Sequence, residues 1–138
     1  MTADNSSATS KMPSVLDEMM RGLFKEPATP TLHRADVVQM ILEKMRQRDI
    51  IAEFILLSDG PASPQSLYDA SGTRVQFPPD EGYRRCFVAL IDPHPLTKWA
   101  HEAFWAFIPA GGGEVVLQPT SWPYADGPVR FTRESLPR

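Results

Sequence analysis

Hydrophobic and polar positions follow a helical period in the first part of the chain. Between residues 32 and 48, apolar side chains recur every three or four positions, which predicts one amphipathic helix. Its apolar stripe consists of Val37, Val38, Ile41, Leu42 and Met45. A similar pattern runs from Val15 to Phe24 and predicts an earlier helix, which Pro27 would end.

The later part of the chain has the pattern of short β-strands separated by turns. Runs rich in β-branched and aromatic residues, bounded by glycine, proline, aspartate and serine, favour strands. The predicted strands cover residues 50–57, 73–77, 83–91, 103–108, 114–118 and 129–132. Glycines 111–113 suit a β-hairpin connection. Two N-terminal helices followed by a mainly antiparallel sheet of five to six strands predict an α+β fold.

The two central predicted strands are apolar on both faces. Side chains alternate between the faces of a strand, so one face of strand 83–91 carries Cys86, Val88 and Leu90. The other face carries Phe87, Ala89 and Ile91. The helix near residues 32–48 is expected to cover one face. The opposite face would then need the earlier helix, a second copy of the protein or another partner.

Length, charge and composition narrow the class of protein. The 138 residues suffice for one domain, predicted over residues 13–138 behind a disordered polar tail of residues 1–12. The net charge of -3 contains no basic block, so no nucleic acid and no membrane surface is expected as a partner. A single cysteine and the absence of a signal-peptide pattern or a long apolar stretch predict a cytoplasmic protein.

The polar segment 92–102, between the two central strands, carries most of the candidate chemistry. It holds His94 and His101, and Cys86 precedes it in the sequence. An enzymatic hypothesis takes Cys86 as the nucleophile, one of the two histidines as its base, and Asp92 or Glu102 as the group that orients the base. A core role for Cys86 competes with this hypothesis, because free cysteines are among the most buried residues.

A metal site in the same segment is a further hypothesis. Asp92, His94 and His101 offer carboxylate and imidazole ligands of the kind that zinc or iron binds. Their spacing matches no metal-binding motif, and glycines 111–113 are not followed by the Lys-Ser/Thr pair of a phosphate-binding loop. The sequence therefore predicts no metal and no cofactor.

Tryptophan and arginine side chains are the candidate binding residues. Trp99, Trp105 and Trp122 could line a small-molecule cavity over the sheet, although aromatic residues on strands commonly pack in the core. Arg84 and Arg85 begin strand 83–91, where they could bind a carboxylate or phosphate or simply lie in solvent.

These features leave three functional hypotheses. The apolar strands favour a small, non-catalytic interaction or accessory module that binds a protein partner or itself, with a homodimer through the apolar sheet face as one form. The first alternative is a small Cys/His-dependent hydrolase or transferase centred on residues 92–102. The second alternative is a small-ligand binding domain.

Overall fold

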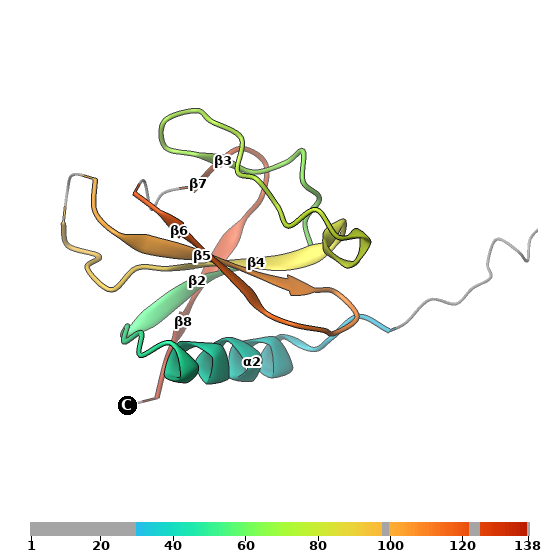
Figure 1. Cartoon of the computed structure of the whole chain (residues 1–138), viewed down its shortest axis with the longest axis horizontal. Helices are drawn as coiled ribbons and strands as arrows, with labels where there is room; N and C mark the ends of the chain where they lie inside the picture. Colours follow the sequence, from blue (N-terminus) through green and yellow to red (C-terminus); the bar gives the residue numbers. More distant parts are fainter. Residues whose placement is uncertain (1–29, 98–99, 122–124, 138) are drawn as a thin grey trace, which may run out of the picture. The chain divides into compact units, whose positions relative to one another are not determined.

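The computed structural model describes residues 30–97, 100–121 and 125–137. This part of the chain contains one α-helix, α2 (Arg34–Gln47), one 3-10 turn, η1 (Glu81–Tyr83), and a five-stranded antiparallel sheet (Figure 1). The sheet consists of β2 (Phe54–Ser58), β4 (Cys86–Ile91), β5 (Ala103–Pro109), β6 (Val116–Thr120) and β8 (Phe131–Ser135). Two short strands, β3 (Tyr68–Asp69) and β7 (Ala125–Asp126), pair with each other separately.

The α+β class with an antiparallel sheet is confirmed, but the architecture with two N-terminal helices is wrong. The described residues hold one α-helix, a 3-10 turn and five strands in the main sheet. The earlier predicted helix, near residues 15–24, and the predicted tail, residues 1–12, lie outside the described residues. Periodicity was a weak basis for that helix, because Gly22 costs a helix about 1 kcal/mol and a short helix needs a packing partner.

Helix α2 follows the prediction closely and begins at an anchored arginine. Asp36 in its first turn and Arg46 in its last turn complement the helix dipole. The guanidinium of Arg34 donates hydrogen bonds to the carbonyl oxygens of Ser58, at 2.9 Å, and Leu57, at 3.1 Å. It also forms an ion pair with Glu134 on β8. These contacts hold the start of α2 against β2 and β8.

One face of the sheet packs against α2, as expected. The strand order is β6-β5-β4-β2-β8, and α2 lies along one side of this sheet in Figure 1. The buried sheet residues that share a core with α2 are Ile55, Leu57, Phe87, Ala89, Ile91, Ala106 and Ile108. The predicted alternation along strand 83–91 is therefore confirmed, because Phe87, Ala89 and Ile91 belong to this core.

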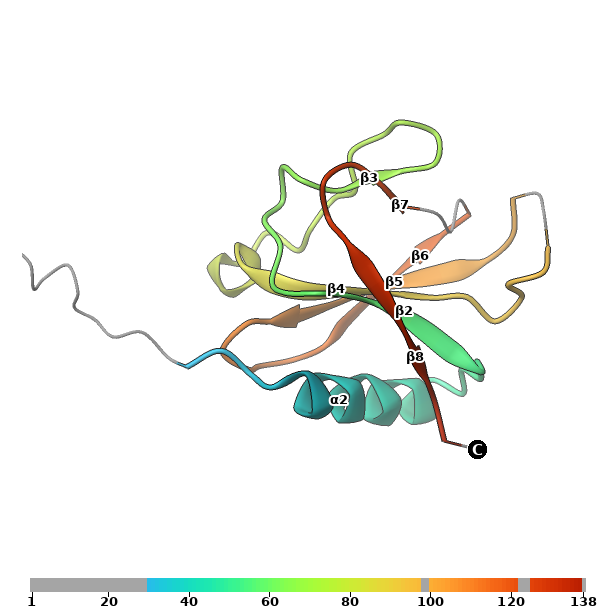
Figure 2. The same cartoon turned by 180° about the vertical axis from the view of Figure 1, so that it is seen from behind.

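The opposite face is covered by the connection between β2 and β4, residues 59–85. This connection lies on the side of the sheet away from α2, as Figure 2 shows from behind. Its buried side chains include Leu67, Val75 and Tyr83. They share a second core with the sheet residues Cys86, Val88, Leu90, Trp105 and Phe107. The prediction that this face needs the earlier helix, a second copy of the protein or another partner is wrong, because the connection itself supplies the apolar side chains.

The predicted strand at residues 73–77 is also wrong. These residues form irregular chain, with an isolated bridge between Arg74 and Tyr68. Pro78 and Pro79 follow directly, and proline has no N–H group to extend a ladder. Phe77 instead packs on the sheet, where its ring centroid lies 4.9 Å from that of Phe107.

Ser58 is the buried polar side chain among the described residues. Its hydroxyl oxygen accepts a hydrogen bond of 3.0 Å from the backbone N–H of Val88. We expect Ser58→Ala to lower the free energy of unfolding by about 1–3 kcal/mol, because it leaves that N–H buried without an acceptor. Denaturant unfolding of Ser58→Ala and of the control Ser66→Ala, whose hydroxyl lies near the surface, measures the difference. Equal, small losses in both variants would contradict the assigned role.

Candidate functional site

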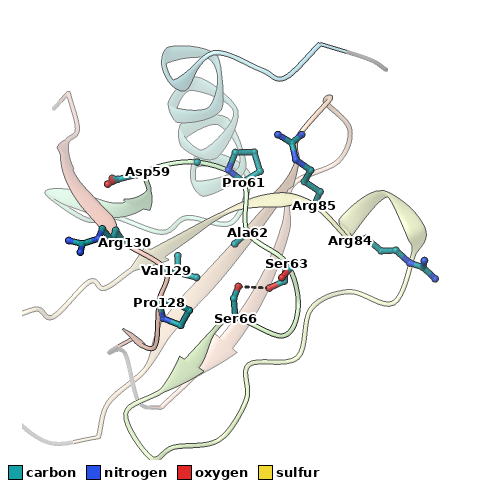
Figure 3. A pocket seen from close by; sticks show the side chains of 11 residues that line it. Asp59, Pro61, Ala62, Ser63, Ser66, Arg84, Arg85, Pro128, Val129 and Arg130 are labelled. Carbon is teal, nitrogen blue, oxygen red and sulfur yellow. Dashed lines mark hydrogen bonds between the residues drawn. The ribbon is translucent and has the colours of Figure 1, made fainter. Parts of the chain in front are cut away.

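A pocket of about 520 Å³ opens beside the first residues of β4 (Figure 3). Three segments that are distant in the sequence line it. They are the turn after β2, within residues 59–66, the pair Arg84 and Arg85 before β4, and residues 128–130 before β8. We call it the arginine-rimmed pocket, because each of its two sides carries arginine.

Backbone hydrogen bonds hold the three segments together. The N–H of Asp59 donates to the carbonyl of Arg130 at 2.8 Å. Ala62 and Cys86 exchange two hydrogen bonds, 2.8 Å from the Ala62 N–H and 3.1 Å from the Cys86 N–H. The hydroxyl of Ser66 donates to the carbonyl of Ser63 at 2.7 Å and tightens the turn (Figure 3). The walls of the pocket are thus extensions of the β2, β4 and β8 pairing.

The rim of the pocket is cationic. Arg84, Arg85 and Arg130 are exposed, and Arg130 lies on one side of the pocket while Arg84 and Arg85 lie on the other (Figure 3). The side chains of Arg84 and Arg130 make no hydrogen bond or ion pair with any residue that the structure describes, and the guanidinium of Arg85 donates a 3.3 Å hydrogen bond to the hydroxyl of Thr31. The one acidic lining residue, Asp59, accepts a hydrogen bond from the hydroxyl of Thr132. The guanidinium groups therefore keep donors available for an anionic ligand.

The wall between the arginines contains apolar and hydroxyl side chains. Its apolar residues are Pro61, Ala62, Pro128 and Val129, of which Ala62 is buried, and Ser63 and Ser66 lie beside them (Figure 3). Among the described lining residues there is no histidine and no cysteine. The pocket combines cationic donors at its rim with apolar contacts between them.

Asp92 and His101 meet at a second place, the connection between β4 and β5. His101 Nε2 lies 2.8 Å from Asp92 Oδ1, and both side chains are largely buried, with exposed fractions of 10% and 12%. The same carboxylate oxygen accepts the backbone N–H of His94 at 2.9 Å. The backbone N–H of His101 donates to the carbonyl of Ser121 at 3.1 Å. These bonds fix the course of the connection next to the end of β6.

Cys86 does not join this cluster. It is fully buried at the start of β4, whereas Asp92 follows the end of the same strand. A strand rises about 3.3 Å per residue, so the two residues are roughly 20 Å apart along β4. Burial also raises the pKa of the Cys86 thiol to about 12. The structure thus brings Asp92, His94 and His101 together and leaves the proposed nucleophile at the opposite end of the strand.

The other binding residues that the sequence predicts lie in the core, in the pocket or outside the described residues. Trp105 is 1% exposed and packs in the core with Phe131, so it is not a wall of an open cavity. Trp99 and Trp122 lie outside the described residues. Arg84 and Arg85 line the arginine-rimmed pocket. Arg130 was not predicted as a binding residue. It lines the same pocket as the two other arginines only because β2 pairs with both β4 and β8.

The described residues contain neither a cluster of metal ligands nor a membrane-spanning helix. In the described ranges, no three or more His, Cys, Asp or Glu side chains are grouped so that they could hold a metal ion. The described helix is too short and too polar to cross a membrane.

Compared with known proteins, the chain matches no family model, no curated protein and no solved structure.

Proposed function

We propose that this protein is a small, non-catalytic cytoplasmic module that binds a partner protein at the arginine-rimmed pocket. The observation that carries the proposal is the rim of the pocket: the side chains of Arg84 and Arg130 are exposed and make no hydrogen bond or ion pair with the described residues. Arginine is enriched in protein interfaces, where its planar group binds carboxylates with two parallel hydrogen bonds. The single cysteine, which is free and buried, is consistent with a reducing compartment.

The partner contact is assigned to the pocket and not to the sheet. Both faces of β4 and β5 are buried within the chain, by α2 on one side and by residues 59–85 on the other. The large apolar side chains that stand exposed in the described part are Ile51 and Leu96, on separate connections, and Ile51 lines a second pocket of about 640 Å³ together with Ile50 and Leu136. A few exposed apolar residues are ordinary on protein surfaces, so they do not by themselves favour self-association.

The two other hypotheses have less support. A Cys/His-dependent enzyme needs a thiol within hydrogen-bond reach of an imidazole, and Cys86 lies one strand length away from His101 and Asp92. A small-ligand site over the sheet needs an open cavity at Trp105, which is buried in the core. The arginine-rimmed pocket carries three exposed arginines, and arginine is enriched in protein interfaces.

Filling the pocket tests the proposal. A Cβ atom at Gly60, which lines the pocket, would meet no atom within 4 Å, and the same holds for Gly82, which does not line it. We expect cross-linking of the tagged full-length chain in extract of its source cells to capture a protein partner. The wild type and Gly82→Trp should retain that partner, and Gly60→Trp should retain at least about tenfold less, a loss of about 1.4 kcal/mol in binding.

The matched variants distinguish a partner that binds at the pocket from one that binds elsewhere on the protein. Both replace a glycine in open space by the same bulky residue, so a difference between them reports the location and not the size of the new side chain. Equal capture by all three proteins would contradict the proposal, and so would the failure of the wild type to enrich any protein above a tag-only control.

A further inference from the structure

We infer that the segment bound in the arginine-rimmed pocket is acidic, with an apolar side chain between carboxylates. The inference rests on the proposed function and adds the chemistry of the partner. It follows from three properties of the pocket: the spacing of its arginines, the apolar wall between them and the local sign of its charge.

The side chains of the three arginines do not converge on one point (Figure 3). Arg130 stands on one side of the pocket, and Arg84 and Arg85 stand on the other with their side chains directed apart (Figure 3). A single phosphate is best held where guanidinium groups converge on one point. Carboxylates on both sides of a short extended segment would instead meet one arginine side each, because such a segment advances by about 3.3 Å per residue.

The wall between the arginines favours an apolar side chain in the middle of the segment. Pro61, Ala62 and Val129 supply the apolar part of this wall, beside Ser63 and Ser66, in a pocket of about 520 Å³. Exposed ion pairs contribute little to affinity by themselves, because water and salt screen them. Removal of an apolar side chain from water supplies the affinity that the charged rim lacks, while the rim selects the sequence.

The sign of the local charge agrees with an acidic ligand although the whole chain carries -3. Three arginines and one aspartate line the pocket, and the aspartate is hydrogen-bonded to Thr132. Exposed charges that lie farther from a ligand than the Debye length, about 8 Å at physiological ionic strength, have little influence on its binding. The approaching segment therefore meets a positive rim on an otherwise acidic protein.

A set of labelled synthetic peptides tests the inference with the full-length chain. The first probe is Asp-Glu-Phe-Glu-Asp, and the second replaces its phenylalanine by alanine. The third replaces its acids by asparagine and glutamine, and the fourth is this neutral peptide with phosphoserine at its centre. Fluorescence anisotropy should show the first peptide binding at least about tenfold more tightly than the second and third. Its affinity should fall as salt rises.

Single substitutions locate the contact. Arg84→Gln and Arg130→Gln should each weaken binding of the first peptide several-fold, and Gly60→Trp should abolish it. The matched control is Arg48→Gln, which removes an exposed arginine at the end of α2, outside the pocket, and should leave the affinity unchanged. Equal loss with Arg48→Gln would show a non-specific charge effect and overturn the inference.

Other results of the peptide titrations would overturn the inference, the proposed function or both. Equal binding of the neutral and acidic peptides, or tighter binding of the phosphoserine peptide or of inorganic phosphate, would overturn the inference. If no peptide binds while a cellular partner is still lost in Gly60→Trp, the proposed function stands and the acidic segment is wrong. If neither peptide binding nor pocket-dependent capture is observed, both fail.

Discussion

Phe107→Ala is expected to lower the free energy of unfolding by about 3–5 kcal/mol, a large part of the stability of a small domain. Phe107 lies on β5, is fully buried and faces the connection 59–85. Its ring centroid lies 4.9 Å from that of Phe77. Alanine would leave a cavity at the point where this connection meets the sheet, so the loss combines lost burial with lost packing.

Leu96 provides the control for this substitution. It is also a large apolar residue, but it is 91% exposed on the connection between β4 and β5. Leu96→Ala should change the free energy of unfolding by less than about 0.5 kcal/mol. Denaturant unfolding measures both variants under identical conditions. A loss below about 1 kcal/mol for Phe107→Ala would mean that the second face of the sheet is not covered by the chain itself.

The thiol of Cys86 is expected to resist alkylation in the folded protein. Burial raises its pKa from 9.0 to about 12, so the thiolate fraction near pH 8 falls roughly a thousandfold. The thiolate is the species that attacks iodoacetamide. A time course of mass spectra at pH 8 should therefore show native alkylation at least about a thousandfold slower than alkylation of the unfolded chain.

Burial also slows alkylation directly, because Cys86 has no accessible surface for the reagent to reach. The unfolded chain, in denaturant, is the internal control for reagent activity. Alkylation at similar rates in the folded and unfolded states would contradict the buried position of Cys86. It would also restore the hypothesis of a Cys86 nucleophile.

The strongest sequence signals gave correct elements. Helix α2 extends over Arg34–Gln47, close to the predicted residues 32–48, because five apolar residues at helical spacing define one face. Strand β5 occupies Ala103–Pro109 against the predicted 103–108. The alternation of β4 between two cores also followed from the sequence, since it depends only on the pleat of a strand.

The cover of the second sheet face could not be predicted in the same way. Leu67, Val75 and Phe77 lie in the long connection 59–85, where prolines, serines and glycines interrupt any period. Apolar residues in irregular chain carry no local signal for the surface that they will contact. The helical pattern near residues 15–24 suggested a cover for this face, whereas the connection provides it.

The candidate site was predictable only in part. Arg84 and Arg85 were recognised as possible ligands for an anion, but Arg130 and the turn at Gly60 come from other segments. Their meeting depends on β2 pairing with β4 and β8, which one sequence does not specify. The separation of Cys86 from Asp92 was not predicted, although the length of strand β4 between the two residues implies it.

Backbone chemical-shift mapping of the intact chain shows where an acidic segment binds. Titration of the isotope-labelled protein with Asp-Glu-Phe-Glu-Asp should shift the amide signals of the pocket, above all Gly60, Arg85 and Arg130. Signals around Asp92 and His101 should stay in place. Shifts that gather at Asp92 and His101, or no shifts at peptide concentrations of a few millimolar, would contradict the account.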